Sequence, residues 1–306
     1  MSHDHDHAGH GHSHAPASFG RAFAIGTALN IGFVVVEAVY GILAGSMALL
    51  ADAGHNLSDV LGLVIAWGAA TLAKRSPSAR YTYGLRSSSI LAAFLNALLL
   101  LVAIAVIAVE AIRRFSEPAP VAGTTVMIVA AIGIVINGVT AWLFASGRKG
   151  DLNVRGAFLH MAADAAVSAG VVVAGFIISR TGWALIDPVT SLVIVAVIAI
   201  GTWGLLRDSV NMSLQATPPG LDTEDVADFL RQRPGVAGIH DLNIWPLSTT
   251  ETALTVHLLM PGDYPGDAYT ADLATALHDQ FGIDHATVQI ETDAGTPCRL
   301  EPDGVI

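Results

Sequence analysis

Long stretches of apolar residues fill the chain as far as about residue 213, and a more polar, alternating pattern follows them. Each stretch reaches the roughly 20 residues that a helix needs to cross a bilayer. Charged or turn-forming residues, such as Ser76-Pro77 and Asp187-Pro188, separate the stretches. The pattern predicts six transmembrane helices in a membrane domain of residues 19–213. They are expected at 20–43, 48–73, 86–112, 121–146, 154–179 and 187–209.

A second, smaller domain is predicted after a linker at Thr217-Pro218-Pro219-Gly220. Its first helix begins with Asp222 or Thr223 as the cap. Its second strand alternates apolar and other residues from Leu254 to Met260. The predicted order is αββαβ, a small two-layer α+β domain over residues 214–292 with a tail at 293–306. The elements are expected at 221–233, 235–245, 252–260, 268–281 and 285–291.

The first 18 residues form a polar segment in which histidines alternate with Asp, Gly, Ser and Ala: His3, His5, His7, His10, His12 and His14. Such a segment has little to bury, so we expect it to be disordered and to bind metal loosely. An affinity tag is the alternative, although tags are usually unbroken runs of histidine. No cleavable signal peptide is evident, because no short basic segment leads into an apolar run.

The composition and charge of the chain exclude several classes of function. Hydrophobic residues make up 53% of the chain and charged residues only 13%, about half the share usual in a soluble domain. The net charge of -11 argues against a nucleic-acid partner. The single cysteine, Cys298, excludes an intrachain disulfide. Basic residues near the helix ends favour one side of the membrane, which places both termini in the cytoplasm.

The pattern His-x-x-x-Asp occurs twice within the apolar stretches, as His55 with Asp59 and as His160 with Asp164. Residues four apart share one face of a helix, so each pair presents an imidazole beside a carboxylate. Ionisable groups at membrane depth are costly and usually functional. A structural hydrogen-bonded pair is the alternative, but two occurrences on separate helices weaken it. Facing each other, the pairs would offer the four ligands of tetrahedral zinc or another borderline divalent ion.

Such a site predicts a metal carrier coupled to protons. Binding requires neutral imidazoles and ionised carboxylates, so loading the metal displaces protons and protonation expels the metal. Asp52 lies three residues before His55 and either hydrogen-bonds near the site or caps the second helix. Asn30 and Glu37, like Asn96 and Asn137, either line the pathway or join helices.

These residues resemble the cation diffusion facilitator family of divalent-metal/proton antiporters, and specifically its bacterial zinc-exporting branch. The matching segments are Glu37 to Asp59, Thr82 to Arg86, Leu91 to Asn96, Arg155 to Asp164 and His240 to Trp245. The resemblance implies six transmembrane helices, a ferredoxin-like or metallochaperone-like cytoplasmic domain, a homodimer, and export of cytosolic zinc across the bacterial inner membrane by alternating access. The family's transport ligands fall on His55, Asp59, His160 and Asp164, a set that the family associates with zinc.

The chain departs from the family pattern in two places. The loop at 76–81 has neither Asp nor His, so we expect no metal site there. Asn243 and Gln289 stand where some relatives have histidine. Four residues remain as candidate cytoplasmic ligands, with ordinary polar edge residues as the alternative: His240, His257, His285 and Glu291. Cys298 is either a soft ligand or, as we favour, an exposed free thiol.

Other classes of function compete with a zinc/proton antiporter. A membrane metalloprotease would carry His-Glu-x-x-His, which the chain lacks, and a four-ligand site leaves no position for an activated water. We therefore expect no enzyme and no prosthetic group. A channel is disfavoured because tight coordination slows release. A membrane-bound metal sensor without transport, and a carrier of Cd²⁺, Co²⁺ or Ni²⁺, stay open.

Overall fold

The computed structural model describes residues 21–73, 75–145, 152–293, 295, 296, 298 and 300. Within its helices, the side chains of 21–27, 62, 63, 65–67, 69, 70, 73, 143–145 and 152–160 lie outside this description. The expectation of disorder for residues 1–18 also falls outside the described residues. The chain divides into two compact units, one running to Val60 and resuming over Ile107–Ile194, the other comprising Leu61–Val106 and Val195 onward.

Long helices occupy the predicted apolar stretches. They are α1 (Arg21–Leu43), α2 (Met47–Ala73), α3 (Ser88–Ser116), α4 (Gly123–Ala145), α5 (Leu152–Thr181) and α6 (Ile186–Ser213). Among the described residues, α3, α6 and most of α4 and α5 form four helices that are long and apolar enough to cross a membrane, and Ala28–Leu43 is a shorter apolar helix. Large apolar side chains such as Ile42, Trp142 and Ile200 are exposed on them. Such outward apolar surface is typical of helices that face lipid.

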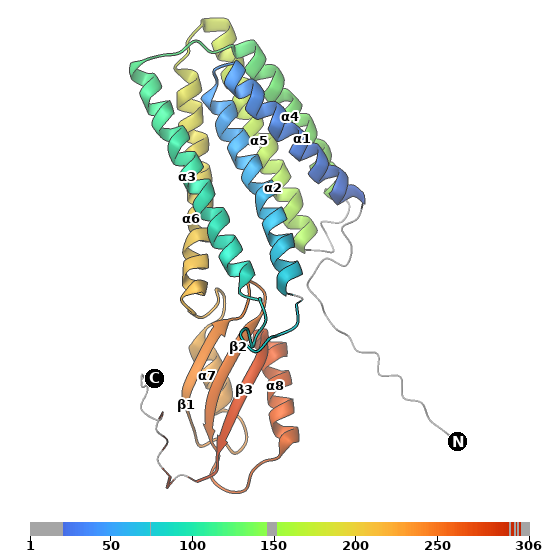
Figure 1. The fold of residues 1–306 in the computed structure, drawn as a ribbon, viewed down its shortest axis with the longest axis vertical. Helices are drawn as coiled ribbons and strands as arrows, with labels where there is room; N and C mark the ends of the chain where they lie inside the picture. The colour runs from blue at the N-terminus through green and yellow to red at the C-terminus, as the bar shows by residue number, and fades with distance from the viewer. Residues whose placement is uncertain are drawn as a thin grey trace, which may run out of the picture. The chain divides into compact units, whose positions relative to one another are not determined.

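In the first unit, α4 packs along α5, and α1 lies against α4 (Figure 1). The close approach of α4 and α5 depends on two glycines. A Cβ atom on Gly175 would lie 2.8 Å from the carbonyl oxygen of Gly123, and one on Gly123 would lie 2.7 Å from the carbonyl oxygen of Gly175. No side chain larger than hydrogen fits at either position, so the two backbones touch, as helices in membranes commonly do at small residues.

The second unit contains the predicted αββαβ arrangement, in the order α7 (Thr223–Arg231), β1 (Gly238–Pro246), β2 (Thr252–Leu259), α8 (Asp267–Phe281) and β3 (Ile283–Glu291). Asp222 is the N-cap of α7, accepting from the backbone N–H of Glu224 at 2.9 Å. The sheet is mixed, with β2 between an antiparallel β1 and a parallel β3. The predicted element order and the cap are confirmed.

Helices α7 and α8 cover one face of this sheet (Figure 1). Val226 and Leu230 of α7 and Leu273 and Leu277 of α8 form a core with the alternate β2 residues Leu254, Val256 and Leu258. Because side chains alternate across a strand, His257 points to the opposite face. Helices α7 and α8 therefore leave that second face of the sheet uncovered, and polar side chains such as His257 can lie on it.

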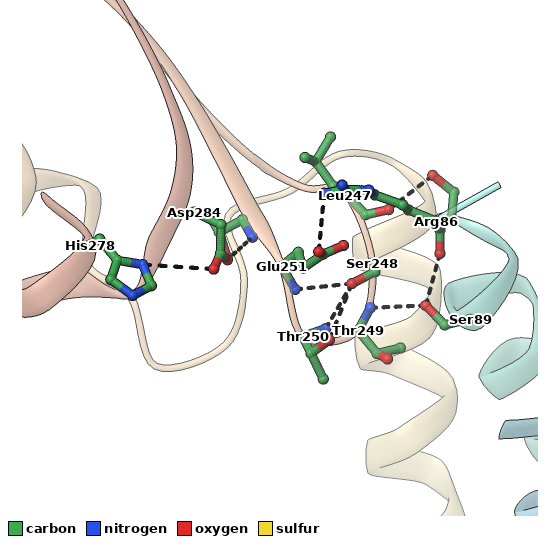
Figure 2. A network of polar contacts seen from close by, with 11 residues as sticks. Arg86, Ser89, Leu247, Ser248, Thr249, Thr250, Glu251, His278 and Asp284 are labelled. Atoms are coloured by element: carbon green, nitrogen blue, oxygen red, sulfur yellow. Dashed lines mark hydrogen bonds and ion pairs between the residues drawn. The ribbon is translucent and has the colours of Figure 1, made fainter. Parts of the chain in front are cut away.

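The start of α3 is joined to the turn between β1 and β2 by polar contacts within the second unit (Figure 2). The guanidinium of Arg86 donates to Glu251 Oε1 at 3.0 Å, and the backbone N–H of Thr249 donates to Ser89 Oγ at 3.1 Å. Ser87 Oγ donates to the carbonyl oxygen of Leu247 at 3.2 Å. Charged and hydroxyl groups at the start of α3 thus hold the tip of the sheet.

Candidate metal centres

Three of the four predicted membrane ligands lie together in the first unit. His55 Nε2 of α2 is 3.3 Å from Asp164 Oδ1 of α5 and 3.7 Å from Asp59 Oδ2, one helical turn further along α2. One ligand atom from each residue lies within 4.8 Å of the others. Bonds of about 2.0–2.2 Å place the N and O ligands of tetrahedral zinc roughly 3.3–3.6 Å apart. The separations therefore suit a single bound divalent cation.

His160, the fourth predicted ligand, is in α5 four residues before Asp164, but its side chain lies outside the described residues. Helical spacing puts positions 160 and 164 on the same face of α5. A ligand role for His160 stays a prediction. Asp164 itself is buried, whereas His55 and Asp59 are partly accessible, so the described cluster combines a buried carboxylate with two partly accessible groups.

Buried polar side chains next to this cluster connect its two helices to each other and to α1. Ser168 Oγ of α5 donates to Asp52 Oδ2 of α2 at 3.1 Å, and Asn56 Nδ2 of α2 donates to Glu37 Oε2 of α1 at 3.2 Å. Asp52 is therefore a hydrogen-bonding partner inside α2; the alternative that it caps the helix is wrong, because α2 begins at Met47. Glu37 joins helices, as one of the two predictions for it allowed.

The start of α2 is capped by Ser46, whose Oγ accepts from the backbone N–H of Leu49 at 3.2 Å, and by Asp187 of α6, which the sequence did not indicate. Asp187 accepts from the backbone N–H groups of Met47 at 2.7 Å and Ala48 at 3.4 Å and from the hydroxyl of Ser46. The guanidinium of Arg114 lies 3.9 Å from the same carboxylate. The sequence predicts only a helix boundary at Asp187-Pro188. Its carboxylate satisfies the N–H groups that begin the helix carrying His55 and Asp59.

A second group of possible ligands lies on the helix-free face of the sheet in the second unit. It consists of His240 on β1, His257 on β2, Glu291 at the end of β3 and Cys298 in the tail, with one ligand atom of each within 4.8 Å of the others. His240 and His257 are directly opposite each other in the β1–β2 pairing. Burial alone would raise the pKa of the Glu291 carboxyl, but the hydrogen bond with Cys298 and the nearby His240 lower it overall.

His285 is not part of this group, contrary to the expected set. It shares a face of β3 with Glu291, but it pairs with Ala253 whereas Glu291 pairs with Leu259. Six residues of strand at about 3.3 Å each separate the two side chains by about 20 Å. The ring of His285 instead makes an edge contact with Tyr83, at 5.5 Å between centroids.

Cys298 takes the place that His285 was expected to fill. Its Sγ lies 3.5 Å from His257 Nδ1. The thiol is in no disulfide, as expected, but the residue is half-buried rather than exposed. A signal was present in the sequence, because Asp293, Gly295 and Thr296 are turn-forming residues between Glu291 and Cys298. That signal predicts a turn but not the strand to which the tail returns.

Comparison with known families settles the class of protein. Residues 23–212 match the cation efflux transmembrane domain, and residues 218–293 match the cytoplasmic domain of cation efflux proteins. The chain belongs to the cation efflux family. The resemblance to the cation diffusion facilitators and their zinc-exporting branch is thereby confirmed. This cation efflux protein is an integral membrane protein of a transporter family, and no catalytic activity is indicated.

Several curated relatives align with this cation efflux protein over most of their length. The zinc transporter ZitB of Escherichia coli (strain K12) is 37% identical over 276 residues, 89% of this chain and 88% of the relative. The cadmium, cobalt and zinc/H(+)-K(+) antiporter of Bacillus subtilis (strain 168) is 35% identical over 267 residues, 86% of each chain. The metal cation efflux system protein CzcD of Cupriavidus metallidurans is 36% identical over 285 residues, 93% of this chain and 89% of the relative.

Proposed function

We propose that this protein exports Zn²⁺ from the cytosol in exchange for protons, through a site formed by His55, Asp59, His160 and Asp164 between α2 and α5. The observation that carries the proposal is the meeting of His55, Asp59 and Asp164 around one small volume between two apolar helices. Two imidazoles and two carboxylates are ligands that zinc accepts in tetrahedral geometry. The names of the zinc transporter and the antiporter among the relatives support the same cargo and coupling.

The chemistry of these ligands supplies the coupling. An imidazole binds metal only when neutral, and a carboxylate binds it best when ionised, so Zn²⁺ and protons compete for the same atoms. When the site opens to a compartment of lower pH, protonation of the imidazoles expels the ion. Because α2 carries both His55 and Asp59, a movement of α2 relative to α5 would change the ligand geometry and the access together.

The proposal includes a membrane arrangement. All six helices α1–α6 span the bacterial inner membrane, with both termini and the α+β domain in the cytoplasm and two chains in a homodimer. The excess of basic residues near the helix ends on one side supports this orientation. The match to the cytoplasmic domain of cation efflux proteins supports the location of the α+β domain. The first 18 residues, with their histidines, would raise the zinc concentration near the cytoplasmic entrance.

A flux assay in vesicles of defined orientation tests the proposal. Metal uptake is measured for Zn²⁺, Cd²⁺, Co²⁺, Ni²⁺, Mn²⁺ and Fe²⁺, with and without a proton gradient. We expect zinc flux that requires or dissipates the gradient, that is lost in His55→Ala and Asp164→Asn, and that persists in His278→Ala, a matched change at an exposed histidine on α8. Zinc flux that is indifferent to the gradient would disprove the proton coupling.

Two alternatives give different results in the same assay. A carrier adapted to Cd²⁺, Co²⁺ or Ni²⁺ would transport one of these faster than Zn²⁺, and the name of the Bacillus relative includes cadmium and cobalt. A metal sensor would show no flux, and its response to metal would persist in His55→Ala. The cluster at His240 and His257 is the feature that favours a sensor, so flux in the unmodified protein decides between the two.

A further inference from the structure

We propose that Glu37 and Asp52 share one proton, and that this carboxyl pair positions the turn of α2 that carries His55. Glu37 lies in α1 and Asp52 in α2, and neither is one of the proposed metal ligands. The positioning role deepens the transport proposal, because it rests on a metal site between α2 and α5. The shared proton follows from the geometry of the two carboxyl groups and is tested separately.

Both side chains of the carboxyl pair are fully buried, at 0% exposure each. Glu37 Oε2 accepts from Asn56 Nδ2 at 3.2 Å, and Asp52 Oδ2 accepts from Ser168 Oγ at 3.1 Å. The second oxygens, Glu37 Oε1 and Asp52 Oδ1, meet no N–H or O–H group of the protein within the described part of the chain. A buried carboxylate oxygen without a donor is costly, so these two atoms require a hydrogen.

The missing hydrogen lies between the two side chains, because Glu37 and Asp52 are hydrogen-bonded to each other. An ionised carboxylate only accepts hydrogen bonds, so a bond between two carboxyl groups requires a proton on one of them. Two ionised carboxylates in contact and away from water would also repel each other strongly. The carboxyl pair therefore holds one proton and one negative charge, as paired carboxyl groups in enzyme active sites do.

A metal ion would be a poor substitute for this proton. Asn56 and Ser168 present hydrogens, and not oxygens, to the carboxyl groups. Among the described residues this leaves Glu37 Oε1 and Asp52 Oδ1 to contact an ion, whereas Mg²⁺ and Ca²⁺ take six or more oxygen ligands. A proton needs only the two oxygens that are present.

Glu37 contacts α2 on both sides of His55. Asp52 and Asn56 are four residues apart, so they lie one above the other on one face of α2. Glu37 reaches both of them, accepting from Asn56 and sharing the proton with Asp52. The turn of α2 between these two positions contains His55. Glu37 thus ties the ligand-bearing turn to α1, whereas Ser168 ties it to α5.

The charge of the carboxyl pair acts on the proposed transport ligands. Asp164 of α5 interacts electrostatically with both carboxyl groups, and His55 of α2 interacts with Asp52. Helix α4, which packs against α1, contains no ionisable residue. A second negative charge at the pair would therefore disturb the ligand cluster directly, and the shared proton keeps the charge at one.

Infrared spectroscopy of the full-length protein tests for the proton. Exposed carboxyl groups are ionised at neutral pH, so a protonated-carboxyl C=O band that shifts in D₂O reports a group such as this pair. We expect the band in the unmodified protein and its loss in Glu37→Gln. Asp52→Asn should also lose it, because the new amide donates to Glu37 and no proton is required. Glu110→Gln, a matched change at a half-exposed glutamate, should leave the band unchanged.

Zinc binding and zinc flux test the positioning role. The side chain in Glu37→Gln can still accept from Asn56 and donate to Asp52, so affinity and flux should stay near those of the unmodified protein. Glu37→Ala removes both contacts and should weaken zinc binding roughly 10-fold, because unmade buried hydrogen bonds are costly. Rescue by glutamine of what alanine loses would assign the role to hydrogen bonding at this position.

A spectrum of the unmodified protein without the band would overturn the proposal, and so would a band that survives in Asp52→Asn. Zinc binding that weakens equally in Glu37→Gln and Glu37→Ala would contradict positioning by hydrogen bonds. The expected band losses in a protein without zinc flux would contradict the transport function and leave the shared proton standing. Proton-coupled zinc flux in a protein without the band would do the reverse, so the two proposals can fail separately.

Discussion

The hydroxyl of Ser168 in α5 donates a hydrogen bond of 3.1 Å to the carboxylate of Asp52 in α2, and both side chains are buried. Asp52 lies one turn before His55, and Ser168 lies one turn after Asp164. The bond therefore joins the two helices immediately beside the proposed transport ligands. A contact at this position fixes how far α2 and α5 stand apart where a metal would bind.

Ser168→Ala should lower the free energy of unfolding by about 1 kcal/mol. The substitution removes an interhelical hydrogen bond and leaves the buried Asp52 Oδ2 without the Ser168 donor. Zinc affinity should fall as well, since the ligands are no longer held at one spacing. Thermal unfolding in detergent and zinc flux in vesicles measure the two effects. The matched control is Ser179→Ala, whose exposed hydroxyl donates to the carbonyl oxygen of Phe176 in its own helix. Equal losses in both variants would contradict a special role for the Asp52 contact.

Substitution by alanine should have different effects on stability at two glycines of α5. A Cβ on Gly175 would lie 2.8 Å from the carbonyl oxygen of Gly123 and from the backbone nitrogen of Met127, so Gly175→Ala must push α4 and α5 apart and should destabilise the protein. A Cβ on Gly170 meets no atom within 4 Å among the described residues. Gly170→Ala should be neutral or stabilising, by up to about 1 kcal/mol from helix propensity. Thermal unfolding of the two variants checks the sign of each change.

The carboxylate of Asp187 should contribute more to stability than an exposed neighbour of the same charge. Asp187→Ala removes the acceptor of two backbone N–H groups at the start of α2 and leaves Arg114 without this partner, so we expect a loss of about 2 kcal/mol. The control is Glu110→Gln, because Glu110 is half exposed and its contact with Arg114, at 3.7 Å, is worth about 0–1 kcal/mol. Denaturation monitored by tryptophan fluorescence measures both, and a larger loss in Glu110→Gln would refute the capping role.

Much of the fold was predictable because it depends on local periodicity. Apolar stretches long enough to span a bilayer gave the helix positions, and the change to alternating apolar residues around Leu254 and Val256 gave the strands of the α+β domain. The pairing of His55 with Asp59 followed from helical spacing alone. The approach of His55 to Asp164 follows only from the repetition of the motif. In the structure His55 Nε2 lies 3.3 Å from Asp164 Oδ1.

Contacts set by tertiary structure were not predictable. Nothing near Asp187 in the sequence indicates that it caps a helix beginning at Met47, far earlier in the chain. The choice between His285 and Cys298 depended on distance along a strand and on the path of the tail, and face alternation gives neither. Alternation correctly put His285 on the same face as Glu291, but the pairing places them at opposite ends of β3.

The ion pair between Arg86 and Glu251 should couple the start of α3 to the tip of the sheet. Arg86→Glu and Glu251→Arg should each reduce the stability of the protein, and the double variant should recover much of the loss, because the pair is restored with reversed charges. The two side chains are 39% and 34% exposed, so the coupling energy should be at most about 1 kcal/mol and should shrink at high salt. The control pair is Arg231 with Glu224, which joins the last and first turns of the same helix, α7. If reversal of both charges at Arg86 and Glu251 recovers nothing in unfolding experiments at low salt, the hydroxyl contacts of Ser87 and Ser89 alone hold this junction.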